Sequence, residues 1–100
     1  MARIAFHLRI TDGMRDEYRK KHKHVPDALK EAYLNAGAGL NTYSVFESDG
    51  HVFGFMDVDD PDVIKDVMIE SEAQAEWAEE MEPVLENQEN IWLDEVYRMI

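Results

Sequence analysis

Residues 42–58 read TYSVFESDGHVFGFMDV, and this segment sets the architecture expected for the rest of the chain. Two runs rich in β-branched and aromatic residues, Thr42–Phe46 and Val52–Val58, predict two strands. Between them stands Ser48-Asp49-Gly50, and an Asp-Gly pair flanked by such runs is typical of a tight hairpin turn. The sequence therefore predicts two neighbouring antiparallel strands in the middle of the chain.

A strand and a long helical stripe precede this hairpin. In residues 3–10 the apolar side chains fall on the even positions, which is the period of a strand with one face on a core. In residues 14–36 they recur at spacings of three and four, as on one face of a helix that ends at Gly37. Pro26 lies inside this stripe, and its ring would clash with the carbonyl of His22. We therefore expect the helix to kink or restart there.

A second helical region and a last strand follow the hairpin. The segment Asp60-Pro61-Asp62 predicts a helix start, because a capping residue stands before a proline at the first helical position. Ser71, with Gln74 three residues later, fits a capping box and predicts a further helix that runs to the residue before Pro83. Residues 91–99 have the pattern of the last strand.

The order strand, helix, strand, strand, helix, strand is the split βαβ arrangement of ferredoxin-like domains. Such an α+β fold (βαββαβ) has four antiparallel strands with helices on one face. Phe53 and Phe55, with apolar residues of either parity on the adjacent strands, predict hydrophobic groups on both faces, more than one helical layer covers. We expect a single domain over residues 1–100 and a homodimer that packs through the bare face of the sheet.

Composition and charge exclude several functions. The chain has 22 Asp and Glu against 10 Lys and Arg, a net charge of −12, so neither nucleic acid nor an anionic membrane is an expected partner. Residues 59–100 contain fourteen of the acidic side chains, which we interpret as a solvated surface. The absence of cysteine excludes thiolate nucleophiles and Cys-ligated zinc. With no apolar run of membrane-spanning length and no signal-peptide pattern, we expect a cytoplasmic protein.

Tyr18 and His22 are the titratable pair best placed for chemistry. They are four residues apart on the apolar stripe of the first helix, so one lies above the other. Histidine exchanges protons near neutral pH and a tyrosine hydroxyl can donate, accept or orient, so the pair could supply general acid/base assistance. The spacing taken alone is better explained by a half-buried pair whose polar atoms bond backbone carbonyls.

Trp77 and Tyr43 are the aromatic residues best placed to line a pocket. Flat apolar rings with a polar tip suit the C–H patches and hydroxyls of a sugar, although plain core packing explains both residues more simply. His22 and His24 are two residues apart on a helix and diverge, so we expect no metal site. The chain has no phosphate-binding loop or dinucleotide motif, so we expect no nucleotide cofactor.

Several segments, spread over nearly the whole chain, resemble the L-rhamnose mutarotase family. They are Asp16-Glu17-Tyr18-Arg19-Lys20-Lys21-His22, Ala36-Gly37, Tyr43-Ser44-Val45-Phe46, Trp77 before Met81, and Leu93-Asp94-Glu95-Val96-Tyr97. The resemblance implies a homodimeric α/β barrel without a cofactor, an isomerase that interconverts the α and β anomers of L-rhamnose or a related 6-deoxy aldohexose. It also implies that His22 is the acid/base residue, that Tyr18 assists it and positions the substrate, and that Tyr43 and Trp77 line the sugar pocket.

The sequence departs from the family pattern at two places. Members usually show an aromatic pair where this chain has Trp77-Ala78, and Trp-Pro where it has Val25-Pro26-Asp27, so the pocket is expected to differ in shape. The same architecture hosts several chemistries. A cofactor-free monooxygenase-like protein and a non-catalytic ligand-sensing protein of the dimeric α/β barrel type therefore remain alternatives from the sequence.

Overall fold

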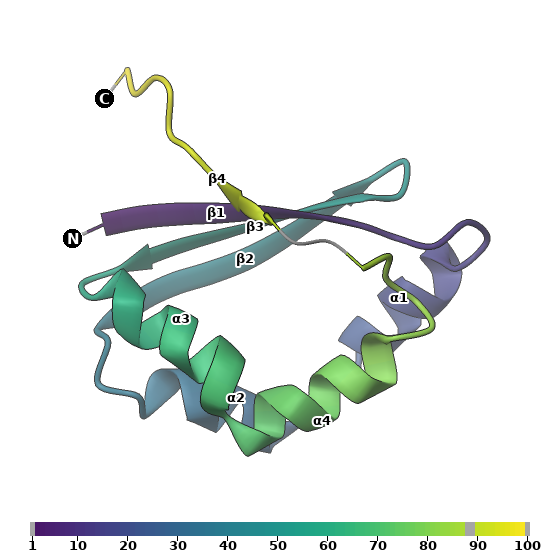
Figure 1. Ribbon diagram of the computed structural model, residues 1–100, viewed down its shortest axis with the longest axis horizontal. Helices are drawn as coiled ribbons and strands as arrows, with labels where there is room; N and C mark the ends of the chain where they lie inside the picture. The colour runs from purple at the N-terminus through teal and green to yellow at the C-terminus, as the bar shows by residue number, and fades with distance from the viewer. Residues whose placement is uncertain (1, 88–89, 100) are drawn as a thin grey trace.

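The protein is built on one antiparallel sheet with the strand order β2-β3-β1-β4 (Figure 1). The computed structural model describes residues 2–87 and 90–99. The strands are β1 (Ala2–Arg9), β2 (Leu40–Ser48), β3 (His51–Val58) and β4 (Trp92–Leu93). The helices are α1 (Arg15–His22), α2 (Asp27–Leu34), α3 (Pro61–Glu70) and α4 (Glu72–Met81). This order confirms the expected ferredoxin-like α+β fold, with two helices in each crossover.

The central hairpin forms as predicted. Ser48 pairs with His51, so Asp49 and Gly50 are the two turn residues, and both have a positive φ, 51° and 82°. A type I′ turn requires this left-handed conformation at both central positions, which Asp and Gly tolerate. The tight turn thereby fixes the register of β2 against β3.

The first crossover contains two short helices. α1 ends at His22, and α2 begins at Asp27, directly after Pro26 in an extended conformation (φ −60°, ψ 140°). Proline cannot donate the helical hydrogen bond and its ring excludes the preceding turn of helix. The restart expected at Pro26 is confirmed, and it makes His22 the last residue of a helix rather than a residue in its middle.

The second crossover keeps the predicted helix starts but not all the predicted caps. Pro61 occupies the start of α3, whereas the side chain of Asp60 makes no capping hydrogen bond. At α4 the Oγ of Ser71 accepts a hydrogen bond from the amide of Gln74 at 3.4 Å. The Gln74 side chain does not complete the capping box, because its Oε1 accepts a hydrogen bond from the Tyr33 hydroxyl at 2.7 Å.

The last strand is much shorter than predicted, so the expectation of a strand over residues 91–99 is wrong. Only Trp92 and Leu93 pair with β1, opposite Phe6 and Ala5. β4 is an edge strand with a neighbour on one side, and beyond Leu93 the chain leaves the sheet (Figure 1). An ion pair between Arg3 and Glu95, rather than further strand pairing, connects the following segment to β1.

All four helices lie on one side of the sheet, and the core lies between them and the strands (Figure 1). Phe6 of β1 points into this core and is 3% exposed. Its ring occupies the space above Gly54 of β3, where a Cβ atom would approach the ring to 2.1 Å. Glycine at this position therefore lets a large aromatic ring lie directly on the sheet.

The opposite face of the sheet carries exposed aromatic side chains. Phe46 and Phe53 pair across β2 and β3 and are 63% and 43% exposed. His7 lies beside Phe53, and its Nε2 is 3.0 Å from Nδ1 of His51. The expectation of hydrophobic groups on both faces is confirmed.

Within residues 2–87 and 90–99, none of the helices has the length and apolar character needed to cross a membrane.

Candidate functional site

A cavity of about 1280 Å³ lies between the sheet and the helices, and all four sequence-predicted site residues line it. Tyr18 and His22 come from α1, Tyr43 from β2 and Trp77 from α4. A smaller hollow of about 300 Å³ shares Tyr18 and His22 with it. The fold thus brings together residues up to 59 positions apart in the sequence, from Tyr18 to Trp77.

The Tyr18–His22 pair has a geometry suited to proton transfer. The two rings stack at a tilt, with centroids 4.2 Å apart. Nδ1 of His22 is 3.0 Å from the backbone carbonyl oxygen of Tyr18. A carbonyl oxygen can only accept, so Nδ1 carries the hydrogen and donates. In the neutral imidazole, Nε2 is then the nitrogen that can take up a proton.

Trp77 packs against the His22 ring from a second direction. Its ring meets the His22 ring edge to face, with centroids 5.2 Å apart and planes at 86°. The imidazole therefore lies between an aromatic residue of its own helix and one of α4. Packing of this kind limits the ring to few rotamers, which keeps a proton-transferring group in one orientation.

Tyr43 lies on a wall of aromatic residues. Its ring centroid is 5.6 Å from that of Tyr33 and 6.3 Å from that of Phe6, both in edge-on contacts. Tyr33 donates a hydrogen bond to Gln74, so the polar end of this wall is held in place from α4. Tyr33 and Gln74 also line the cavity, although their sequence patterns did not indicate it. Tyr33 lies within the apolar stripe predicted over residues 14–36, and Gln74 within the predicted capping box.

Burial keeps the tyrosines of the cavity protonated. It raises the pKa of Tyr18 and of Tyr33 well above the ordinary value, with smaller contributions from the charges of nearby groups. Burial also raises the pKa of Tyr43 to about 12. At neutral pH each hydroxyl is therefore a neutral group that can donate a hydrogen bond, and none of the three is a base.

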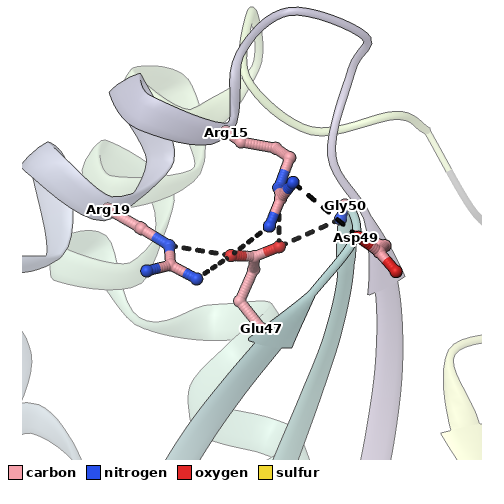
Figure 2. A network of polar contacts seen from close by, with 5 residues as sticks. All are labelled: Arg15, Arg19, Glu47, Asp49 and Gly50. Atoms are coloured by element: carbon pink, nitrogen blue, oxygen red, sulfur yellow. Dashed lines mark hydrogen bonds and ion pairs between the residues drawn. The ribbon is translucent and has the colours of Figure 1, made fainter.

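The smaller hollow is also lined by a half-buried glutamate that the sequence pattern did not indicate. The side chain of Glu47 on β2 is 6% exposed and accepts hydrogen bonds from Arg15 and Arg19 of α1 and from the amide of Gly50 (Figure 2). The Gly50 amide and the two guanidinium groups lower the pKa of Glu47 to about 2. The available signal was its register: Glu47 pairs with the fully buried Val52, so a charged residue stands at an inward-facing position of a strand.

Among the residues that the structure describes, no three His, Asp or Glu side chains converge in a way that could hold a metal ion. The groups that converge on the cavity are instead an imidazole, tyrosine hydroxyls, a carboxamide and an indole. Such groups bind and orient a small polyhydroxylated molecule and can move a proton on it. Fold and cavity together define an α+β protein of the ferredoxin-like class with an aromatic pocket that contains a histidine.

Comparison with known proteins identifies the family. The model of the L-rhamnose mutarotase family matches residues 3–99. The L-rhamnose mutarotase of Listeria monocytogenes serovar 1/2a is 30% identical over 92 residues, which are 90% of this chain and 86% of the relative. That of Ligilactobacillus salivarius is 31% identical over 84 residues, 79% of this chain and 75% of the relative. The chain belongs to the L-rhamnose mutarotase family, a family of isomerases.

Solved structures agree in fold. The crystal structure of an L-rhamnose mutarotase from Formosa agariphila superposes with a TM-score of 0.82 at 21% identity, and the match covers 100% of both chains. A NIPSNAP-like domain protein from Burkholderia xenovorans superposes with a TM-score of 0.59 at 12% identity, over 96% of this chain and 87% of that one. The architecture is therefore shared beyond the mutarotases, so its chemistry has to be argued from the cavity.

Proposed function

We propose that the protein catalyses the interconversion of the α and β anomers of L-rhamnose, with His22 as the acid/base residue. The observation that carries the proposal is the His22 imidazole at the cavity wall, with Nδ1 bonded to a backbone carbonyl and Nε2 left to exchange a proton. Membership of the L-rhamnose mutarotase family supports the substrate.

The chemistry needs only proton transfers. Nε2 of His22 takes the proton of the anomeric hydroxyl, and the bond between C1 and the ring oxygen breaks to give the open-chain aldehyde. His22 returns the proton to the former ring oxygen. Rotation about the bond between C1 and C2 turns the other face of the aldehyde to that hydroxyl, and the same steps in reverse close the ring. General acid/base assistance of this kind accelerates a reaction by about 10²–10⁴-fold.

The other three residues have binding roles in this proposal. Tyr18, protonated at neutral pH, donates a hydrogen bond to a sugar hydroxyl or to the ring oxygen. Tyr43 and Trp77 offer apolar ring faces to the C–H side of the sugar, and the Tyr43 hydroxyl can bond one of its oxygens. Their common position on one cavity supports these roles.

Exchange NMR on the anomeric protons of L-rhamnose tests the proposal, with L-fucose and D-glucose as comparison sugars. We expect the wild-type protein to accelerate exchange of L-rhamnose, and His22→Ala to lose about 10²–10⁴-fold of the rate. His24→Ala is the matched control, because His24 follows α1 and is exposed to solvent. An unchanged rate of anomer exchange in a folded His22→Ala variant would refute the assignment of His22. If the wild-type protein accelerated anomer exchange for none of the three sugars, the proposed activity would be refuted.

We also propose that the protein works as a homodimer joined through the open face of the sheet, in the cytoplasm. The exposed Phe46, Phe53 and Leu93 on or beside this face support the dimer, because isolated domains seldom leave adjacent aromatic side chains in water. Light scattering gives the molar mass in solution, and a monomer at all concentrations would contradict the dimer.

A further inference from the structure

Helix α1 has an unusual attachment to the rest of the protein. Tyr18 is the one buried residue of α1, and the other seven residues of the helix are polar or charged. No side chain caps its first turn, and its N-cap position is occupied by Met14. Apolar burial, which normally holds a helix of this length on a core, therefore contributes little here beyond the Tyr18 ring. The candidate acid/base residue His22 is nevertheless the last residue of this helix.

The Glu47 carboxylate supplies the missing attachment. Its Oε2 accepts a hydrogen bond from Nε of Arg15 at 2.9 Å, and its Oε1 accepts one from Nε of Arg19 at 2.8 Å. The amide of Gly50 donates to the same carboxylate at 2.9 Å. Figure 2 shows both guanidinium groups reaching from α1 to the end of β2. We call Glu47, Arg15, Arg19 and the Gly50 amide the carboxylate clamp.

The clamp and the candidate site share one face of the helix. Arg15, Tyr18, Arg19 and His22 follow one another at spacings of three, one and three, the pattern i, i+3, i+4, i+7 of a single helical stripe. Arg19, His22 and Glu47 also line the same small hollow. A rotation or shift of α1 that broke the bonds to Glu47 would therefore move the His22 ring relative to the cavity.

We propose that Glu47 is a positioning residue for the reaction: through Arg15 and Arg19 it fixes the Tyr18–His22 face of α1 against the sugar cavity. This inference rests on the proposed function. The carboxylate does not itself act on the substrate, because its oxygens already accept bonds from two guanidinium groups and an amide. Directional, charge-assisted hydrogen bonds set both the distance and the rotation of a helix, which apolar packing of a single ring does not.

Glu47→Gln tests the proposal with little change of shape. The neutral amide loses the charge that holds the two guanidinium groups, and a displacement of a reacting group by about 1 Å costs on the order of 10²-fold in rate. We expect kcat for anomer exchange to fall by about 10–10²-fold with KM changed much less, and Glu47→Asp to recover part of kcat. Glu31→Gln, at an exposed position of α2, is the matched control and should behave as wild type.

Two further readouts separate positioning from a general loss of structure. Amide hydrogen exchange should accelerate in α1 of Glu47→Gln and stay unchanged in α3, and the NMR signals of the His22 ring should shift. Arg15→Gln, which leaves Glu47 in place, should give the same changes more weakly. Wild-type kcat in folded Glu47→Gln, or equal acceleration of hydrogen exchange in α1 and α3, would overturn the proposal.

The failure of the proposed function gives a different pattern. In that case the wild-type protein does not accelerate the exchange of sugar anomers. The role of Glu47 is then tested by amide hydrogen exchange in α1 and by the NMR signals of the His22 ring alone. Unchanged α1 hydrogen exchange and unchanged His22 signals in Glu47→Gln would then refute the positioning role, whereas selective changes in both would retain it for whatever ligand the cavity binds.

Discussion

Helices α1 and α3 open the two crossovers of the same fold, yet they are attached to it in different ways. α3 buries Ile64 completely and packs Val63, Val67 and Met68 against the same core. α1 buries Tyr18 and is held for the rest by the carboxylate clamp. Apolar burial stabilises without fixing a direction, whereas charge-assisted hydrogen bonds fix a geometry at little gain in stability. The helix that carries the candidate acid/base residue is the one held by geometry.

The largest expected difference between the helices is in stability. Ile64→Ala removes a fully buried side chain and leaves a cavity, so we expect the free energy of unfolding to fall by about 2–5 kcal/mol. Arg15→Gln on α1 should lower the free energy of unfolding much less, because the Arg15 side chain is 48% exposed and ion pairs in contact with water stabilise little. Urea unfolding of both variants measures the difference. Equal losses would show that α1 is part of the stabilising core after all.

A smaller effect is expected at the helix caps of the second crossover. Ser71→Ala removes the side-chain bond to the amide of Gln74, and we expect a loss of about 1 kcal/mol. Asp60→Ala should cost only a few tenths of this, since Asp60 makes no capping bond to α3. Thermal unfolding compares the two variants. A larger loss for Asp60→Ala would mean that its charge near the helix N-terminus, rather than a bond, stabilises α3.

The smallest effect is a pH-dependent loosening confined to α1. The pKa of Glu47 is lowered to about 2, so its bonds stabilise the folded state fully above the ordinary carboxyl pKa of 4.5, and this stabilisation is lost as the pH falls towards 2. We expect amide exchange in α1 to lose protection over this range before exchange in α3 does. Glu47→Gln should remove the pH dependence from α1. Loss of protection in α3 at the same pH as in α1 would instead indicate global acid unfolding.

Local patterns were enough to predict most of the fold. Alternation in β1, the Asp49-Gly50 turn and the break at Pro26 each depend on neighbouring residues, and all three are found as expected. The prediction of the last strand is wrong because pairing at the edge of a sheet depends on the neighbouring strand β1. The segment after Leu93 contacts β1 through Arg3 and Glu95, which lie 92 positions apart. Apolar alternation in residues 91–99 carries no information about that contact.

The local part of the candidate site could also be predicted from the sequence, whereas contacts between distant elements could not. A helical spacing of four places Tyr18 above His22, and their rings do stack. That Trp77 meets the same imidazole depends on how α4 crosses α1, which one sequence does not reveal. Glu47 was missed because the predicted strand ends at Phe46, one residue before it, whereas β2 continues to Ser48. Its inward direction follows from its register with Val52.

The Asp49-Gly50 turn has a practical consequence for protein engineering. Exposed hairpin turns are usual places to insert a tag, to cleave a chain or to create new termini. Here the Gly50 amide donates to Glu47, and Arg15 lies 3.9 Å from the Asp49 carboxylate, so the turn is mechanically linked to α1. An insertion at this turn would therefore displace Glu47 and Arg15, and with them the helix that carries His22. This exposed turn is therefore a poor place to attach a label, and a useful place for substitutions meant to shift α1.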